Sequence, residues 1–315
     1  MFDKRFLADD VRAGVVVFLV ALPLCLGIAL ASNAPLFSGL IAGIAGGIVV
    51  TVFSGSRLGV SGPAAGLAVM VAAGIEQLGL ETYLLVVVFC GVVQLTSGFL
   101  KAGVIAHYFP SSVIKGMLAG IGIILILKQI PHALGYDSSW EGELEFFQRD
   151  GRNTFSEILY AFEALSPGAI IVTVASLAVL LAWQHPAVKD RAFAKALPAP
   201  LLVVVLGISL DTLFSRVGNG LSISTDHLVA VPVSSSFGEF LSNFRRPDFS
   251  QITNPAVYTT GLALALVASI ETLLSVEATD NLDPEKRVTP TNRELKAQGL
   301  GNIVSGLLGG IPLTQ

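Results

Sequence analysis

The feature that most limits the fold of this chain is a series of long apolar segments separated by polar connections. A helix needs about 20 mostly apolar residues to cross a bilayer, and most of these segments approach that length. Hydrophobic residues make up 53% of the 315 residues and charged residues only 13%, about half the share of a soluble domain. The sequence therefore predicts an all-α polytopic membrane protein that has the lipid bilayer as its solvent. We expect helices at 11–31, 36–53, 60–79, 82–100, 112–130, 167–184, 198–215, 256–279 and 296–310.

Basic residues in the connections predict how these helices are oriented. If nine segments alternate, most lysine and arginine residues of the short connections fall on one side of the membrane. They are Lys4, Arg5, Arg12, Arg57, Lys101, Lys189, Arg191, Lys195, Lys286, Arg287, Arg293 and Lys296. By the positive-inside rule that side is cytoplasmic. We therefore predict a multi-pass protein of the cell (inner) membrane, with residues 1–10 in the cytoplasm and residues 216–255 forming an extracytoplasmic loop.

The third segment contains a signal for a helix that begins inside the membrane. Proline is favoured at the first helical position, because its missing N–H has no partner there in any case, and serine or glycine suits the cap. Ser61-Gly62-Pro63 fits this pattern, and we expect residues 58–61 to run extended before it. The sequence thus predicts a discontinuous helix of the kind found at the binding sites of secondary transporters.

Such a helix start would expose backbone donors. The N–H groups of Ala64, Ala65 and Gly66 would have no carbonyl partner within the helix, and unpaired donors are costly in hydrocarbon. An anion would satisfy them, because the N-terminus of a helix carries a partial positive charge. The alternative is an ordinary turn at the membrane surface, which the nearby Arg57 favours.

The eighth segment contains a carboxylate. Glu271 lies near the middle of the apolar run 256–279, where a charge costs about 2.5–3.5 kcal/mol on insertion scales, so its side chain should face protein or a cavity. Ser275 follows at i+4 and therefore lies on the same helix face. The pair could hold a sodium ion through oxygen atoms, or Glu271 could take up a proton. The alternative is a structural hydrogen bond to a neighbouring helix.

Other classes of function have no support in the sequence. The net charge of −4 is small and indicates no nucleic-acid partner. The histidines, His107, His132, His185 and His227, do not have the spacing of metal ligands. We find no Ser-His-Asp set and no phosphate-binding loop. We therefore expect a protein that is not an enzyme and that needs no cofactor other than a coupling ion.

Three collinear stretches resemble the sulfate permease (SulP) family of inorganic anion transporters. Residues 9–71, which include the proline of the first helix and "GSRLGVSGPAAG", resemble the family's opening signature. Residues 91–130 resemble its fourth and fifth helices, and "ELKAQGLGNIVSGLLGGIP" at 294–312 resembles its ninth. Three such stretches at the family's spacing are more specific than any one of them.

The resemblance implies a fold of fourteen segments in two inverted repeats of seven. Residues 11–215 would form the first repeat, and residues 256–315 would hold segments eight and nine of the second. The third and tenth segments of this fold are half-helices whose N-termini meet at the substrate. The chain ends where the tenth segment should begin, so we expect a truncated form that lacks segments 10–14 and the family's cytoplasmic STAS domain.

The resemblance also implies functions for residues. The substrate-binding segment would comprise Ser61, Gly62, Pro63, Ala64 and Ala65. In the bicarbonate-transporter branch of the family, an aspartate and a threonine of a sodium site match Glu271 and Ser275. Because glutamate replaces aspartate here, either Na⁺ or H⁺ could be the coupling ion.

We therefore expect secondary active transport of a small inorganic anion, with bicarbonate as the first choice and sulfate as the second. We expect the full-length form to be a homodimer. Two alternatives remain open at this stage. One is a nucleobase:cation symporter of the same fold, and the other is an uncoupled anion channel or sensor.

Overall fold

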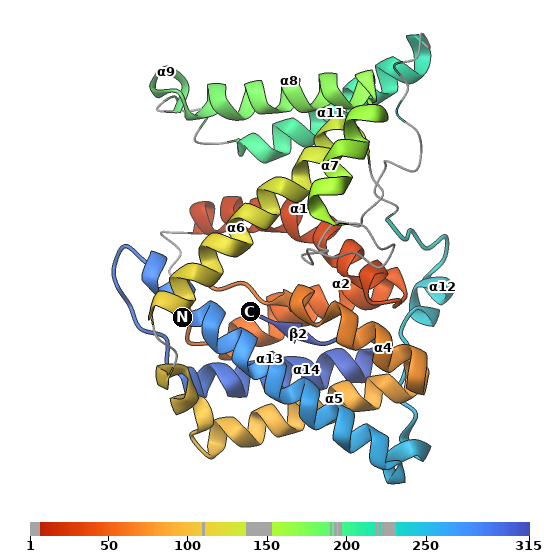
Figure 1. Ribbon diagram of the computed structural model, residues 1–315, viewed down its shortest axis with the longest axis vertical. Coiled ribbons are helices and arrows are strands. Elements are labelled where there is room, and N and C mark those ends of the chain that lie inside the picture. Colours follow the sequence, from red (N-terminus) through yellow and green to blue (C-terminus); the bar gives the residue numbers. More distant parts are fainter. Residues whose placement is uncertain are drawn as a thin grey trace. The chain divides into compact units, whose positions relative to one another are not determined.

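The computed structural model describes residues 7–108, 111–136, 153–189, 191, 194, 197–217, 221, 223 and 231–315. The regular elements of the described chain are helices apart from two short strands (Figure 1), which confirms the predicted all-α class. It forms two compact units. Within the described residues, the first unit runs over 7–23, 123–136 and 153–223, and the second over 24–122 and 231–315. The predicted N-terminal segment 1–10 and loop 216–255 lie partly outside the described residues.

The long helices lie where the apolar segments predict them. Six helical stretches of the described chain are long and apolar enough to cross a membrane. They are α1 (Leu7–Ala31), the continuous stretch Leu36–Phe53, α5 (Leu80–Phe99), α8 (Pro167–Gln184), α11 (Ala199–Val217) and α13 (Pro255–Leu282). The helices α4 (Ala68–Leu78), α6 (Ser111–Leu134) and α14 (Thr291–Leu308) match the remaining three segments. The site described below explains why α4 is short and why α14 is more polar.

In the first unit, α8 packs on α11. The short amphipathic helix α7 (Thr154–Glu163) starts at a capping box, in which the Asn153 side chain accepts from the Ser156 N–H and the Ser156 hydroxyl accepts from the Asn153 N–H. A buried ion pair of 3.6 Å between Lys128 of α6 and Glu157 of α7 joins these two helices.

The second unit is built around α5, α13 and α14, which lie side by side (Figure 1). The helices α5 and α14 approach closely because glycine replaces a side chain at their contact. A Cβ at Gly91 would lie 2.6 Å from the Gly299 carbonyl oxygen, and one at Gly299 would lie 2.7 Å from the Gly91 carbonyl oxygen. The core around this contact contains Tyr83, Leu85, Val86, Cys90, Leu264, Ala268, Ala297 and Leu313, all buried.

The stretch Leu36–Phe53 is one helix with a wider turn inside it. Its parts are α2 (Leu36–Ala45), the π-helical turn η1 (Gly46–Val50) and α3 (Thr51–Phe53). A Cβ at Gly46 would lie 2.1 Å from the Ser61 carbonyl oxygen. The missing side chain at Gly46 therefore lets the backbone of the third segment lie directly against the second.

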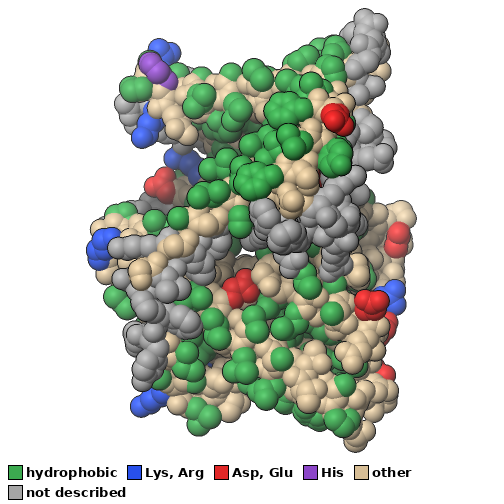
Figure 2. All heavy atoms as spheres, viewed as in Figure 1, with side chains coloured by type: hydrophobic (Ala, Val, Ile, Leu, Met, Phe, Trp, Pro, Cys, Tyr) green, Lys and Arg blue, Asp and Glu red, His purple; other side chains and the backbone are tan. Residues whose placement is uncertain are grey.

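The surface has the character expected of a protein in lipid. Figure 2 shows hydrophobic side chains over much of the visible face, with acidic and basic side chains few and scattered. Large exposed hydrophobic residues occur on every long apolar helix, for example Phe18, Ile48, Val92, Leu181 and Leu266. Such exposure would be unusual in water but is favourable against acyl chains.

Candidate functional site

The candidate site is organised by two strands from distant parts of the chain. β1 (Gly62–Pro63) pairs antiparallel with β2 (Leu313–Thr314), with Gly62 opposite Thr314 and Pro63 opposite Leu313. Gly309 makes the pairing geometrically accessible, because its φ of 98° ends α14 in a left-handed turn. The chain then turns back and carries β2 alongside the third segment.

This pairing corrects the predicted start of the third helix. Ser61-Gly62-Pro63 is not the start of the helix, because Gly62 and Pro63 lie in β1. A 3₁₀ turn, η2, occupies Ala65–Leu67, and α4 follows from Ala68. The helix is still discontinuous, as predicted, but it begins later. The local signals miss the strand because its partner lies at the other end of the sequence.

The structure also shows the partners of the three backbone donors that we expected to be free. The Ala64 N–H donates to the Pro312 carbonyl at 3.1 Å, and the Gly66 N–H donates to the Glu271 carboxylate. Within the described residues, the Ala65 N–H has no hydrogen-bond partner. The expectation of free donors is therefore wrong for Ala64 and Gly66, because neighbouring elements of the same unit satisfy them.

Glu271 reaches the start of the third segment from α13. Its half-buried carboxylate accepts hydrogen bonds from the Thr314 hydroxyl and the Gly66 N–H. A Cβ at Gly66 would lie 3.1 Å from the Glu271 Oε1 atom, so glycine leaves room for the carboxylate. A negative group at the N-terminal turn of a helix is stabilised by the helix dipole. This placement explains how an acidic residue is accommodated in an apolar helix.

The second predicted coupling residue lies one turn further along α13. Ser275 is half-buried, and its backbone carbonyl accepts a 2.8 Å hydrogen bond from the Thr279 hydroxyl. Within the described residues, no hydrogen bond joins the Ser275 hydroxyl to Glu271. No group of three or more His, Cys, Asp or Glu that could hold a metal occurs there either. A sodium ion at Glu271 would therefore depend on hydroxyl and carbonyl oxygens, which are suitable ligands for a hard cation.

A row of polar residues on α14 was not predicted. Glu294, Gln298, Asn302 and Ser305 follow one another at intervals of four, four and three, and each is fully buried. Residues at these intervals lie on one face of a helix. The signal was present in the sequence, since four polar residues at helical spacing in a membrane segment indicate a face turned towards protein and away from lipid.

This polar face of α14 holds both strands. The Asn302 side chain donates to the Leu313 carbonyl at 3.0 Å and accepts from the Leu313 N–H at 2.8 Å, and it also donates to Gln94 of α5 at 2.8 Å. The Ser305 hydroxyl donates to the Ile311 carbonyl at 2.8 Å. Directly before β1, the Gln298 amide donates to the Ser61 hydroxyl oxygen at 2.7 Å. The two strands are thus fixed by side chains of a neighbouring helix.

Comparison with known proteins identifies the family. The sequence profile of the sulfate permease family matches residues 7–315. The chain belongs to the sulfate permease family. It is 29% identical over 99% of its length to the putative sulfate transporter YvdB of Bacillus subtilis, and 28% identical over 98% to the bicarbonate transporter BicA of Picosynechococcus. It covers 55% and 51% of these relatives, so the chain spans about half their length. These relatives are transporters and not enzymes.

Solved structures of anion transporters have the same fold. The transmembrane domain of a cyanobacterial bicarbonate transporter, BicA, superposes with a TM-score of 0.62 and 25% identity, over 99% of this chain and 75% of that one. Murine Slc26a9 in the inward-facing state gives a TM-score of 0.60 at 14% identity, over 100% of this chain and 52% of that one. This sulfate permease chain therefore has the transporter fold with inverted repeats that its motifs predict.

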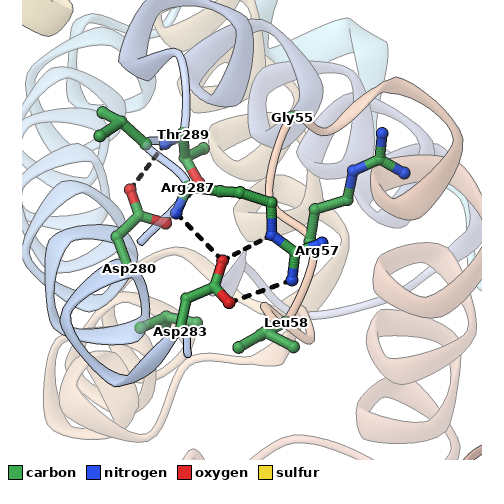
Figure 3. A pocket seen from close by; sticks show the side chains of 9 residues that line it. Gly55, Arg57, Leu58, Asp280, Asp283, Arg287 and Thr289 are labelled. Atoms are coloured by element: carbon green, nitrogen blue, oxygen red, sulfur yellow. Dashed lines mark hydrogen bonds and ion pairs between the residues drawn. The ribbon is translucent and has the colours of Figure 1, made fainter. Parts of the chain in front are cut away.

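A surface hollow at the C-terminal end of α13 does not have the character of an anion site. It is lined in part by Arg57, Asp280, Asp283, Arg287 and Thr289 (Figure 3). The Asp283 carboxylate accepts from the Arg287 Nε at 2.6 Å, and Asp280 accepts from the Thr289 hydroxyl at 2.7 Å. Hydrogen bonding to Arg287 lowers the pKa of Asp283 to about 2. In this sulfate permease chain, both carboxylates of the hollow thus have partners. Their negative charge would repel a bound anion.

Proposed function

We propose that the protein containing this chain is a secondary active transporter of a small inorganic anion, with bicarbonate as the first candidate and sulfate as the second. It would work as a homodimer in the cell (inner) membrane, with its N-terminus in the cytoplasm, and would be coupled to Na⁺ or H⁺. Membership of the sulfate permease family supports the anion. The names of the relatives include both sulfate and bicarbonate transporters.

The observation that supports coupling best is the contact between Glu271 and the Gly66 N–H. This contact puts a carboxylate at the same positive helix end that would attract the anion. Two like charges about 4 Å apart repel by about 1 kcal/mol in water and about 4 kcal/mol at the dielectric typical of a protein surface. The anion would therefore bind weakly while Glu271 is ionised and unpaired. A proton or a sodium ion at Glu271 would remove this repulsion, so anion and cation would bind together.

The segment Ser61–Ala65 is proposed to line the anion site. The Ala65 N–H has no hydrogen-bond partner in the described part of the chain, and Ser61 contributes a hydroxyl one residue before β1. For a sodium ion, the Glu271 carboxylate, the Ser275 hydroxyl and the Thr314 hydroxyl would supply oxygen ligands. When bound, the cation supplies the positive charge that balances the anion.

The test is uptake by proteoliposomes that contain the full-length protein. We expect flux of labelled bicarbonate or sulfate that depends on a Na⁺ or pH gradient. Ser61→Ala should lower the flux at anion concentrations below KM, and Glu271→Gln should lose the coupling. Glu277→Gln is the matched control, because this second glutamate of α13 lies beyond Ser275 and, within the described residues, no hydrogen bond joins its side chain to either strand. Unchanged flux in both Ser61→Ala and Glu271→Gln would remove these residues from the mechanism.

The same assay separates the two alternatives. Inhibition of uptake by uracil or xanthine would indicate a nucleobase symporter. Steady anion currents that ignore the Na⁺ and pH gradients would indicate a channel. Either result would contradict the proposed coupled transport of an inorganic anion.

A further inference from the structure

A chain of three buried side chains connects α14 to the proposed anion segment. The Gln298 Nε2 atom donates to the Ser61 hydroxyl oxygen at 2.7 Å and to the Glu294 Oε1 atom at 3.3 Å. Glu294 and Gln298 are fully buried, and only 6% of Ser61 is exposed. The other carboxylate oxygen of Glu294 accepts from the Ser54 hydroxyl and the Gly55 N–H. Glu294 thus contacts Ser54 and Gly55, which precede β1, directly. It reaches Ser61 through Gln298.

The chemistry of Glu294 fixes which end of the Gln298 amide faces it. The Glu294 Oε1 atom accepts a hydrogen bond in the structure, whereas an amide has a donor end and an acceptor end. Reversing the Gln298 amide would set its carbonyl oxygen against the Glu294 Oε1 atom, where two acceptors would repel. The donor end must therefore face Glu294, and the same nitrogen then serves Ser61.

This orientation of the Gln298 amide leaves the other end of the amide unsatisfied. The Gln298 Oε1 atom is buried and has no hydrogen-bond partner among the described residues. An unsatisfied buried acceptor is unfavourable. If the amide were reversed, Ser61 could donate to Oε1, but the amide nitrogen would then take the buried position that has no partner. The Glu294 Oε1 atom would also lose its donor.

The orientation of the Gln298 amide determines how the Ser61 hydroxyl can bond. A hydroxyl has one hydrogen to donate, and its oxygen already accepts from Gln298. In the described part of the chain, no hydrogen bond uses the Ser61 hydroxyl as a donor. The hydrogen is therefore left available beside the segment that is proposed to bind the anion.

We propose that Glu294, acting through Gln298, sets the Ser61 hydroxyl as a hydrogen-bond donor to the transported anion. Glu294 and Gln298 are positioning residues in this account, and only Ser61 touches the anion. The inference rests on the proposed function. It explains why a buried carboxylate that has no basic partner among the described residues lies two side chains away from an anion site.

The experiment is a double-mutant cycle on the full-length protein in proteoliposomes, with labelled bicarbonate and labelled sulfate as separate probes. Ser61→Ala should raise KM about tenfold, the effect of one lost hydrogen bond to a charged group, with little change in Vmax. Glu294→Gln is nearly isosteric and lets the Gln298 amide reverse, so Ser61 can donate to Oε1 and KM should rise similarly. In the Ser61→Ala background, Glu294→Gln should raise KM no further.

The Gln298→Met variant is a second test of whether Gln298 positions Ser61. It has a similar length but cannot orient Ser61, so it should raise KM in the parent and leave KM unchanged in the Ser61→Ala background. Glu277→Gln is the control and should keep the KM of its background in both cases. Monodisperse elution and an unchanged thermal midpoint would show that each variant is folded.

The outcomes are distinguishable. If Glu294 has only a structural role, Glu294→Gln should lower Vmax and the thermal midpoint, and its effect on KM should multiply with that of Ser61→Ala. That result would overturn this inference but leave the proposed function standing. If the parent is active and neither Glu294→Gln nor Gln298→Met changes its KM, this inference is overturned and the proposed function still stands. A folded parent without flux of either anion would overturn both the proposed function and this inference.

Discussion

Individual residues show that the proposed site is held from two sides. Ser61 is fixed by Gln298 of α14, while Glu271 of α13 accepts from Gly66 and Thr314. These contacts flank the two residues of β1. The backbone between Ser61 and Gly66 is therefore set by side chains of two helices, and its position should respond to small changes of packing.

Gly46 and Gly47 test this dependence as a matched pair. Both lie in η1, but a Cβ at Gly46 would meet the Ser61 carbonyl oxygen at 2.1 Å, whereas one at Gly47 would meet nothing within 4 Å. We expect Gly46→Ala to destabilise the protein by about 1–3 kcal/mol, as overpacking does, and to raise KM by displacing β1. Gly47→Ala should be neutral or slightly stabilising, because alanine is the better helix former. Thermal unfolding in detergent and uptake kinetics measure both effects, and equal effects of the two changes would contradict the proposed close approach.

Among the elements, α14 determines the geometry of the strands. Its buried polar face replaces the hydrogen bonds that an isolated pair of two-residue strands cannot supply. Asn302 mimics a neighbouring strand, because its side-chain amide pairs with both the N–H and the carbonyl of Leu313. This explains why α14 is not among the six helical stretches of the described chain that are long and apolar enough to cross a membrane.

Asn302→Leu should therefore loosen β2. It leaves a buried N–H and a buried carbonyl of Leu313 without partners, at about 1–3 kcal/mol each, so we expect a loss of about 3 kcal/mol in stability. Amide hydrogen exchange should become faster at Leu313 and at Ala64, whose N–H donates to Pro312 in the same strand pair. Asn281→Leu is the control, because Asn281 is exposed and, within the described residues, its side chain donates only to the carbonyl of Glu277. Unchanged protection at both amides would show that α14 does not hold the strands.

For the whole molecule, the contact between Glu271 and Gly66 predicts linked binding of anion and cation. Stabilisation by a ligand grows with its concentration relative to its dissociation constant, by about 2.7 kcal/mol at a hundredfold excess. In the parent, bicarbonate should raise the thermal midpoint more in the presence of Na⁺ or at lower pH, because either neutralises Glu271. In Glu271→Gln the charge is absent, so stabilisation by bicarbonate should no longer depend on Na⁺ or pH. A parent whose midpoint responds to bicarbonate equally under all conditions would contradict this linkage.

The sequence predicted the membrane class and the extents of the long helices well. The reason is that a bilayer acts on each helix separately, through the length and hydropathy of that segment alone. The polar exceptions, Ser61 and Glu271, were also visible, because polar residues in apolar runs are rare. Their roles as anion and cation sites remain predictions.

Other features were decided only by the tertiary structure. Local signals put a helix start at Ser61-Gly62-Pro63, whereas the strand pairing of Gly62 with Thr314 moves the helix start to Ala65. Two of the three predicted free donors are satisfied by Pro312 and Glu271. Helix length and hydropathy are properties of consecutive residues, and the sequence by itself fixes them. The partner of a backbone N–H or a carboxylate depends on which distant segments pack together, and only the folded chain settles that.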